Sequence, residues 1–219
     1  MKSLIEIDQD QNKFLLRCGN SSYAFGVNSA GHLVNLHWGG RIDYLDDLPE
    51  VNNLLDYRYR KPERSLLVRQ EYPAWGDAFY DEPALKMTLA DGTRGAILNY
   101  LDAKLETLDD CEILQVNLED PYYPLTVKLF YKVWKDSEII ERWSEVCNNG
   151  DQDMTLESVM SAAWHMPRID GDYRMSHLSG RWASEGTINR QPIMQNKTVI
   201  DSRTGLSGPF AMPLFALDQ

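Results

Sequence analysis

Apolar and polar residues alternate along much of the chain. Between residues 124 and 134 every second position is apolar or aromatic: Leu125, Val127, Leu129, Tyr131 and Val133. Two lysines and a threonine are among the residues between them. A period of two is the side-chain period of an extended strand, and a strand with one apolar face is half-buried. This segment therefore predicts one strand of an antiparallel sheet that has a core on one side.

The same alternation recurs on both sides of this segment, with turn residues between the runs. Three short strands are predicted near the N-terminus, at residues 13–18, 21–27 and 32–38. Residues 139–148 and 154–164 each follow a polar turn sequence, which predicts that a meander of hairpins continues there. Residues 84–101 hold two strand candidates around Asp91-Gly92, a dipeptide typical of hairpin turns.

Helical periodicity is weak in this sequence. Residues 44–59 are compatible with one helical turn, and residues 41–70 as a whole predict an ordered but irregular excursion. The apolar run from Phe210 to Leu217 predicts a last strand that needs a neighbour. We therefore expect a mainly β protein: a large antiparallel β-sandwich, one domain over residues 1–219, incomplete at its C-terminal end.

The composition narrows the class of function. A net charge of −11 argues against a nucleic-acid partner, because phosphate binding needs clustered lysine and arginine. We find no basic amphipathic segment for a membrane surface, and no apolar run with the length of a signal peptide or a membrane span. Three scattered cysteines indicate reduced thiols and a cytoplasmic location. Six tryptophans and eleven tyrosines favour strands and are also typical of carbohydrate sites.

Sequence motifs of metal, serine or phosphate chemistry are missing. The four histidines are His32, His37, His165 and His177, and they form no HExxH or HxH pair. The sequence has no GxSxG nucleophile elbow and no glycine-rich phosphate loop. We therefore expect surface or hydrogen-bonded histidines and no metal site.

The segment from residue 71 to residue 83 concentrates the candidate chemistry. Its acids are Glu71, Asp77, Asp81 and Glu82, and they stand beside several aromatic residues. Glycoside hydrolysis needs two carboxyl groups, about 5 Å apart for retention and wider for inversion. The same acids also suit turns, because prolines bound the segment and a Gly-Asp pair lies inside it. We favour the structural interpretation, since turn chemistry accounts for these residues without catalysis.

In the structural interpretation the segment is a rigid corner that leads into the next strand. The corner consists of Tyr72, Pro73, Gly76 and Asp77. Tyr72 packs together with Trp75, while Asp77 caps a turn, as does Asp81. Any contact that this corner makes with a sugar is then a rim contribution to another domain or subunit.

Two further stretches leave a choice between a sugar contact and a bend. Residues 162–174 hold a tryptophan, a histidine and an arginine near a Gly-Asp turn. Residues 178–192 hold Arg181, Trp182 and Glu185 after a glycine. No convergent partner is visible for either stretch, so we favour a β bend that buries its tryptophan.

Five stretches in order carry a resemblance to a known family. They are LHWGGRI from residue 36, EYPAWGDAFYDEPALKMTLADGTR from residue 71, ERWSEVCNNGDQDMTLESVMSAAWHMP from residue 141, HLSGRWASEGTINRQPI from residue 177, and DSRTG followed by PLFAL from residue 201 onward. Together they resemble the N-terminal domain of bacterial α-galactosidases, the melibiases of glycoside hydrolase family 36. The resemblance runs from about Lys13 to the last residue. It departs from the family near the end, where SRTGLSGPFAMPLFAL lacks the usual Ser-His and Asn-Pro.

The resemblance implies a function for a longer protein. Such enzymes have an N-terminal β-supersandwich, a (β/α)8 barrel and a small C-terminal β domain. They hydrolyse terminal α-linked galactose in melibiose or raffinose with retention, using two aspartates on the barrel and no metal or nucleotide cofactor. The barrel is absent from this chain, so no catalytic residue is expected in it.

The resemblance also implies partners. The catalytic barrel of the same protein is one, and a homo-oligomer, dimer or tetramer, is another. Asp56 and Arg58 fall where the family has a loop that reaches the substrate of a neighbouring subunit. With Trp75 they are the candidates for the substrate rim.

Two alternatives of other classes remain at this point. One is a free-standing carbohydrate-binding or structural β-sandwich without activity, which the aromatic content permits. The other is a complete small hydrolase that uses Asp77 and Glu82, which no supporting motif favours.

Overall fold

The computed structural model describes residues 3–51, 69–76, 82–166, 173–194, 197–202 and 205–218. The chain divides into two compact units, Met1–Pro167 and Arg168–Gln219. Strands dominate both units, and the described residues contain one helical element, the 3-10 turn η1 (Leu45–Asp47). This turn lies in the stretch that is compatible with one helical turn. Within the described ranges, no helix is long and apolar enough to cross a membrane.

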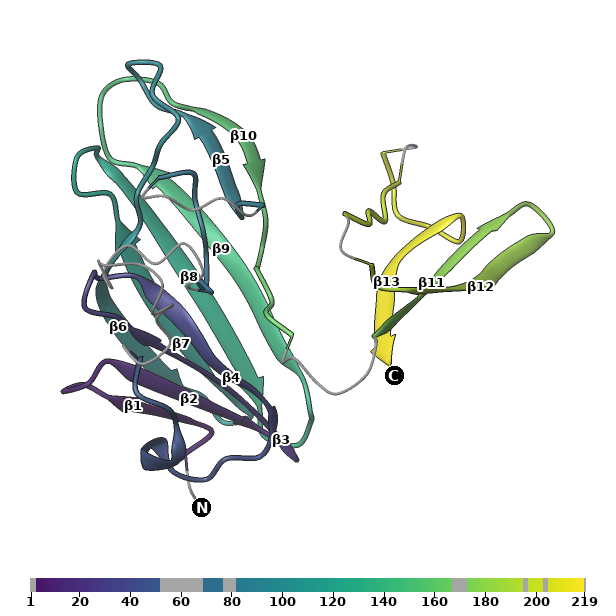
Figure 1. Ribbon diagram of the computed structural model, residues 1–219, viewed down its shortest axis with the longest axis horizontal. Helices are drawn as coiled ribbons and strands as arrows, with labels where there is room; N and C mark the ends of the chain where they lie inside the picture. The colour runs from purple at the N-terminus through teal and green to yellow at the C-terminus, as the bar shows by residue number, and fades with distance from the viewer. Residues whose placement is uncertain are drawn as a thin grey trace. The chain divides into compact units, whose positions relative to one another are not determined.

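Two four-stranded antiparallel sheets form most of unit 1 (Figure 1). The first has the order β1-β2-β3-β4 and consists of β1 (Ile5–Asp8), β2 (Lys13–Cys18), β3 (Ser21–Val27) and β4 (Leu33–Gly40). The second has the order β6-β7-β8-β9 and consists of β6 (Asn99–Thr107), β7 (Cys111–Glu119), β8 (Leu125–Trp134) and β9 (Ile140–Asn148). Each strand pairs with the next one along the chain, so short turns determine both sheets.

The alternation along β8 is the clearest link from sequence to fold. Its ten residues alternate strictly between buried and half-buried, beginning with buried Leu125. The buried face contacts the first sheet, where the rings of Phe25 and Tyr131 stack at 4.7 Å between centroids. Phe14 from β2 stacks on Phe25 at 4.9 Å. The sequence-based prediction of an antiparallel sandwich is therefore confirmed for unit 1.

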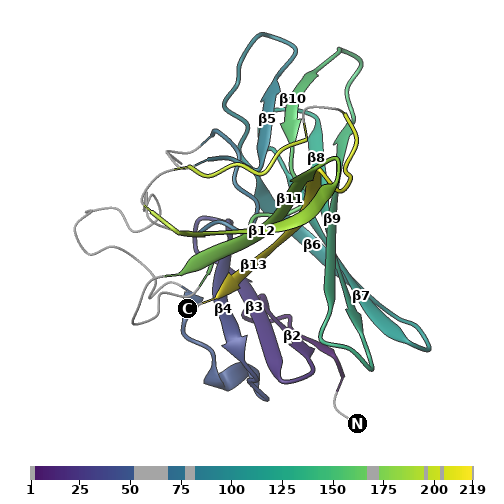
Figure 2. The ribbon, with the colours of Figure 1, turned by 90° about the vertical axis from the view of Figure 1, so that its right-hand side faces the viewer.

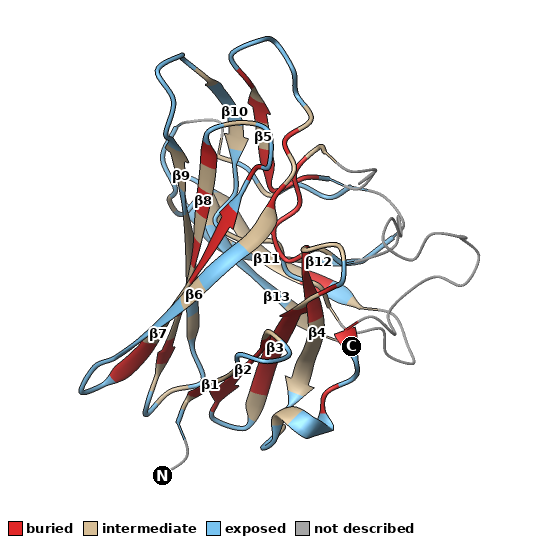
Figure 3. Ribbon diagram, turned by 90° about the vertical axis from the view of Figure 1, so that its left-hand side faces the viewer, coloured by how far each residue is buried: buried red, intermediate tan, exposed pale blue. Residues whose placement is uncertain are grey.

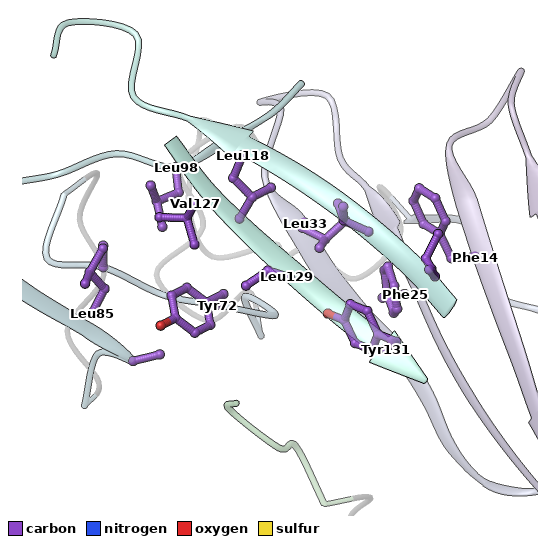
Figure 4. Packing of buried hydrophobic residues seen from close by; sticks show 14 of the residues in the cluster. Phe14, Phe25, Leu33, Tyr72, Leu85, Leu98, Leu118, Val127, Leu129 and Tyr131 are labelled. Carbon is purple, nitrogen blue, oxygen red and sulfur yellow. The ribbon is translucent and has the colours of Figure 1, made fainter. Parts of the chain in front are cut away.

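The core lies between these two sheets. Figure 4 shows side chains from β2, β3 and β4 meeting side chains from β7 and β8, and Figure 3 shows the buried positions along the same strands. Fully burying one large apolar side chain stabilises the fold by about 1.5–3 kcal/mol. The buried set of more than twenty side chains is thus the main force that holds the sheets together.

The pairing of β5 and β10 corrects two sequence-based expectations. β5 (Leu85–Thr88) pairs antiparallel with β10 (Thr155–Val159), at the end of unit 1 opposite the N-terminus (Figure 2). The Asp91-Gly92 turn forms, with Leu89 N–H donating to the Thr93 carbonyl at 2.7 Å, but no hairpin of residues 84–101 follows it. Nor does the meander continue beyond β9, because β10 leaves that sheet for β5.

Unit 2 contains a three-stranded antiparallel sheet of order β12-β11-β13. Its strands are β11 (Arg174–Arg181), β12 (Ser184–Pro192) and β13 (Ala211–Asp218). The apolar run at the end of the chain forms β13, and β11 is its neighbour. Trp182 lies in the β11–β12 turn and is 85% exposed, so the expectation of a buried tryptophan at this bend was wrong. A hairpin tip projects beyond its own sheet, and no described residue of unit 2 covers this ring.

Candidate functional site

Glu71 lies at the centre of a polar cluster inside unit 1. Its backbone N–H donates to the Leu33 carbonyl at 2.8 Å, which attaches the segment to the inner edge of β4. Its side chain points into the interior and is completely buried. A buried carboxylate is costly unless a positive charge and hydrogen bonds compensate it, so its partners define what this site is.

Three side chains from three different strands surround the Glu71 carboxylate. Arg142 on β9 forms an ion pair with it at 2.6 Å, and the arginine side chain is only 3% exposed. The Tyr23 hydroxyl on β3 donates to the carboxylate and lies 2.7 Å from each of its oxygens. The Tyr131 hydroxyl on β8 donates to Oε1 at 2.9 Å. The carboxylate thus joins both sheets of the sandwich.

Aromatic rings enclose the guanidinium of Arg142. Its Cζ atom lies 4.4 Å from the ring centroid of Trp164, 4.7 Å from Tyr131 and 5.5 Å from Tyr23. Nη1 donates to the Ala163 carbonyl at 2.9 Å, so the segment after β10 is also attached to this cluster. Cation–π contacts are stronger where water is excluded, and the arginine therefore organises three segments at once.

The cluster changes the titration of its members. Burial raises the pKa of the Tyr23 and Tyr131 hydroxyls well above their ordinary value, and the negative Glu71 raises them further against the opposing effect of Arg142. For Arg142, burial opposes the charge, but Glu71 and the two tyrosine oxygens raise its pKa above the ordinary value. Both tyrosines are therefore neutral donors, and the arginine stays charged.

This geometry gives Glu71 a structural role. A glycosidase carboxyl must reach a glycosidic oxygen or the anomeric carbon, and Glu71 is enclosed and fully hydrogen-bonded. No polar atom of it is open to a substrate. It is a satisfied internal ion pair of the sandwich.

The residues that follow Glu71 are bonded to several distant segments. The Pro73 carbonyl accepts from the Ala84 N–H at 2.8 Å, and Gly76 N–H donates to the Ala96 carbonyl at 2.7 Å. Tyr72 is buried among the core residues (Figure 4), and its hydroxyl donates to the Met160 carbonyl at 2.7 Å. These bonds give the chain a sharp, multiply attached bend before β5.

Trp75 lies between cationic side chains. The Arg94 guanidinium is 4.3 Å from its ring centroid and the Lys86 ammonium is 5.5 Å from it. Arg94 is itself paired with Glu157, its Nε donating at 3.0 Å, and hydrogen bonds from Thr88 and Arg94 lower the pKa of that glutamate. The guanidinium therefore occupies the position that a stacked sugar ring would take on that face.

The other candidate residues are placed as follows. Asp56, Arg58, Asp77 and Asp81 lie outside the described residues, so the proposed rim at residues 56 and 58 stays a prediction. Glu82 is exposed and pairs with Lys86 at 2.5 Å. His165 Nε2 lies 2.8 Å from the Gln70 carbonyl, as in a hydrogen-bonded structural histidine. No group of three metal-ligating side chains occurs among the residues that the structure describes.

Comparison with known proteins places this arrangement in a family. The model of the glycosyl hydrolase family 36 N-terminal domain matches residues 31–219. The chain belongs to this family. Among curated proteins, it is 30% identical to a probable α-galactosidase G of Aspergillus terreus over 95% of its length, and 30% identical to α-galactosidase Mel36A of Lactobacillus acidophilus over 98%.

Solved family 36 structures have the same fold. α-Galactosidase AgaB of Geobacillus stearothermophilus matches 98% of this chain with a TM-score of 0.86 and 25% identity. AgaA of the same species matches 94% with a TM-score of 0.82 and 26% identity. The chain spans only 30–32% of the length of these relatives. It is the N-terminal part of the family 36 architecture, and the structural role of Glu71 agrees with that position.

Sequence reasoning missed the partners of Glu71 in this family 36 domain. A signal for Arg142 was present: along β9 it falls in phase with Ile140 and Val146, which pack against the core. A charged residue at a core-facing position requires a buried counter-charge. Nothing in the sequence shows which of the 33 acids supplies it.

The buried tyrosines predict a loss of stability at alkaline pH. An unfolded tyrosine titrates near about pH 10, whereas Tyr23 and Tyr131 keep their protons in the folded domain. Above that pH the unfolded state binds fewer protons, so the free energy of unfolding falls by up to about 1.4 kcal/mol per pH unit for each tyrosine. Urea unfolding between about pH 8 and pH 11 measures this slope.

The variant Tyr131→Phe should make the alkaline slope shallower, because it removes one of the two protons. Tyr122→Phe is the matched control, since Tyr122 is 78% exposed. Equal slopes for the two variants would contradict the assignment.

Proposed function

We propose that this chain is the non-catalytic N-terminal part of a retaining α-galactosidase. The observation that carries the proposal is the match to α-galactosidases along almost the whole chain, while the chain spans about a third of their length. The absence of an accessible carboxylate pair among the described residues agrees with it, because the chemistry then belongs to the rest of the protein. The domain supports the catalytic barrel and contributes to contacts between subunits.

The substrates of the whole protein are terminal α-linked galactosides of the melibiose and raffinose type. Variants of the related AgaA have been solved in complex with raffinose and with stachyose, which supports this class. The protein acts in the cytoplasm on imported oligosaccharides. It assembles as a dimer or tetramer.

An activity comparison tests the proposal. The 219-residue chain and the full-length protein encoded by its gene are each incubated with p-nitrophenyl α-D-galactopyranoside. We expect release of p-nitrophenol by the full-length protein alone, with retained anomeric configuration by NMR. Turnover by the chain would contradict its non-catalytic role. A full-length protein without α-galactosidase activity, or a gene that encodes only these residues, would favour a free-standing carbohydrate-binding module instead.

A further inference from the structure

A hollow of about 450 Å³ opens at one end of the β6–β9 sheet in unit 1. The residues that line it are Asp110, Trp134, Asp136, Ser137, Ile139 and Glu141. They come from the β6–β7 turn, the end of β8, the β8–β9 turn and the start of β9. The volume falls within the range of about 300–1,000 Å³ that small-molecule sites occupy. The hollow is separate from the cluster around Glu71, with which it shares no residue.

Hydrogen bonds hold the two turns that form its walls. Lys135 N–H donates to the Asp110 carbonyl at 3.0 Å, and its ammonium donates to the carbonyls of Leu108 at 3.0 Å and Asp109 at 2.6 Å. From the other side, the Asn20 amide donates to the Glu138 carboxylate at 3.0 Å. The β8–β9 turn is thus attached to both sheets, and the walls are formed before any ligand arrives. A preformed site loses less entropy on binding than a mobile one.

Trp134 provides a fixed aromatic surface in this hollow. Its indole N–H donates to Glu141 Oε1 at 2.8 Å, and the Lys132 ammonium lies 3.7 Å from its ring centroid. The ring therefore has a set orientation and already carries a cationic neighbour from its own strand. A second cation from a ligand would meet the lysine charge, so the ring does not favour a cationic ligand.

The remaining groups fit a neutral ligand with many hydroxyls. The carboxylates of Asp110, Asp136 and Glu141 accept hydrogen bonds, and each sugar hydroxyl offers a proton. The Ile139 side chain, 57% exposed, adds apolar surface opposite these acceptors. A pyranose ring has an apolar C–H face and a rim of hydroxyls, and an aromatic ring flanked by carboxylates matches both features.

We propose that this hollow binds one hexopyranose unit of a neutral saccharide, stacked on Trp134 and hydrogen-bonded to the flanking carboxylates. It is a binding site without chemistry, additional to the α-galactoside site of the whole protein. The proposal does not depend on that activity. Such a site increases the local concentration of oligosaccharide at the N-terminal domain.

An NMR titration of the ¹⁵N-labelled chain tests the site. The probes are methyl α-D-galactopyranoside and methyl α-D-glucopyranoside. Binding of either probe should shift the indole resonance of Trp134 and the amide resonances of residues 136–139. Trp134→Ala should weaken the affinity about tenfold or more, as loss of an aromatic stacking surface implies. Asp136→Asn, a change at the exposed turn, should weaken it without altering the other indole resonances.

Trp143→Phe provides the matched control. Trp143 stacks on Phe130 at 4.8 Å on the outer face of the same sheet and does not line the hollow. Its exchange should leave the affinity for sugar unchanged. Three results would overturn the proposal: no shift at saturating sugar, shifts that survive Trp134→Ala, or shifts at residues 136–139 that spermidine produces and neither glycoside does.

Discussion

Replacing Arg142 by methionine is expected to lower the free energy of unfolding by about 3–5 kcal/mol. The exchange removes the only charge that pairs with Glu71 among the described residues, and it leaves a fully buried carboxylate uncompensated. It also removes the donor to the Ala163 carbonyl and the cation between three aromatic rings. Domains of this size are stable by about 5–15 kcal/mol, so the loss is a large share of the total. Urea unfolding followed by circular dichroism gives the value.

A double-mutant cycle separates the ion pair from simple loss of packing. Glu71→Gln removes the opposite charge, so the Glu71→Gln/Arg142→Met protein should lose at least about 1 kcal/mol less than the two single losses added together. Lys128→Met is the matched control. Lys128 pairs with Glu145 at 3.4 Å on the exposed face of the same strands, and its loss should cost less than about 1 kcal/mol. An Arg142→Met effect as small as that of the control would contradict the role given to the cluster.

The strands could be predicted where neighbouring residues decide the structure. The strict alternation of β8 and the short turns between β2, β3 and β4 act over a few residues, and both appear in the fold as expected. The pairing of β5 with β10 did not follow, because it joins segments from different parts of the chain and depends on tertiary packing. Residues 93–98 also resist a strand reading, since Ile97 N–H donates to the Asp120 carboxylate rather than to a neighbouring strand.

The interior of the candidate site was out of reach of sequence reasoning for a related reason. Glu71 and Arg142 look like ordinary surface charges in a sequence with 25% charged residues. Their burial depends on the closing of two sheets around them, which no local pattern encodes. Trp182 illustrates the opposite error: an aromatic residue at a bend suggested burial, yet the tip of a hairpin leaves it exposed.

Replacing Gly76 by alanine is expected to lower the free energy of unfolding by about 2–4 kcal/mol. A Cβ atom at this position would clash with the Ala96 carbonyl oxygen and lie 2.6 Å from its carbon, and 2.5 Å from the Ile97 side chain. The carbonyl cannot retreat easily, because Ala96 is buried and the adjacent Ile97 N–H is bonded to Asp120 at 2.7 Å. Relief of the clash would also break the bond from Gly76 N–H to Ala96, so overpacking adds to a lost hydrogen bond.

Gly95→Ala is the matched control, since it makes the same exchange in the segment that Gly76 contacts. A Cβ atom at Gly95 meets nothing within 4 Å, so this variant should stay within about 0.5 kcal/mol of the native protein. Urea unfolding of both variants measures the difference. Equal stabilities would mean that the 71–76 segment yields to the added methyl group and is not held by residues 96 and 97. A large loss at Gly76 alone would place the close approach of these two backbones among the contacts that fix the entry into β5.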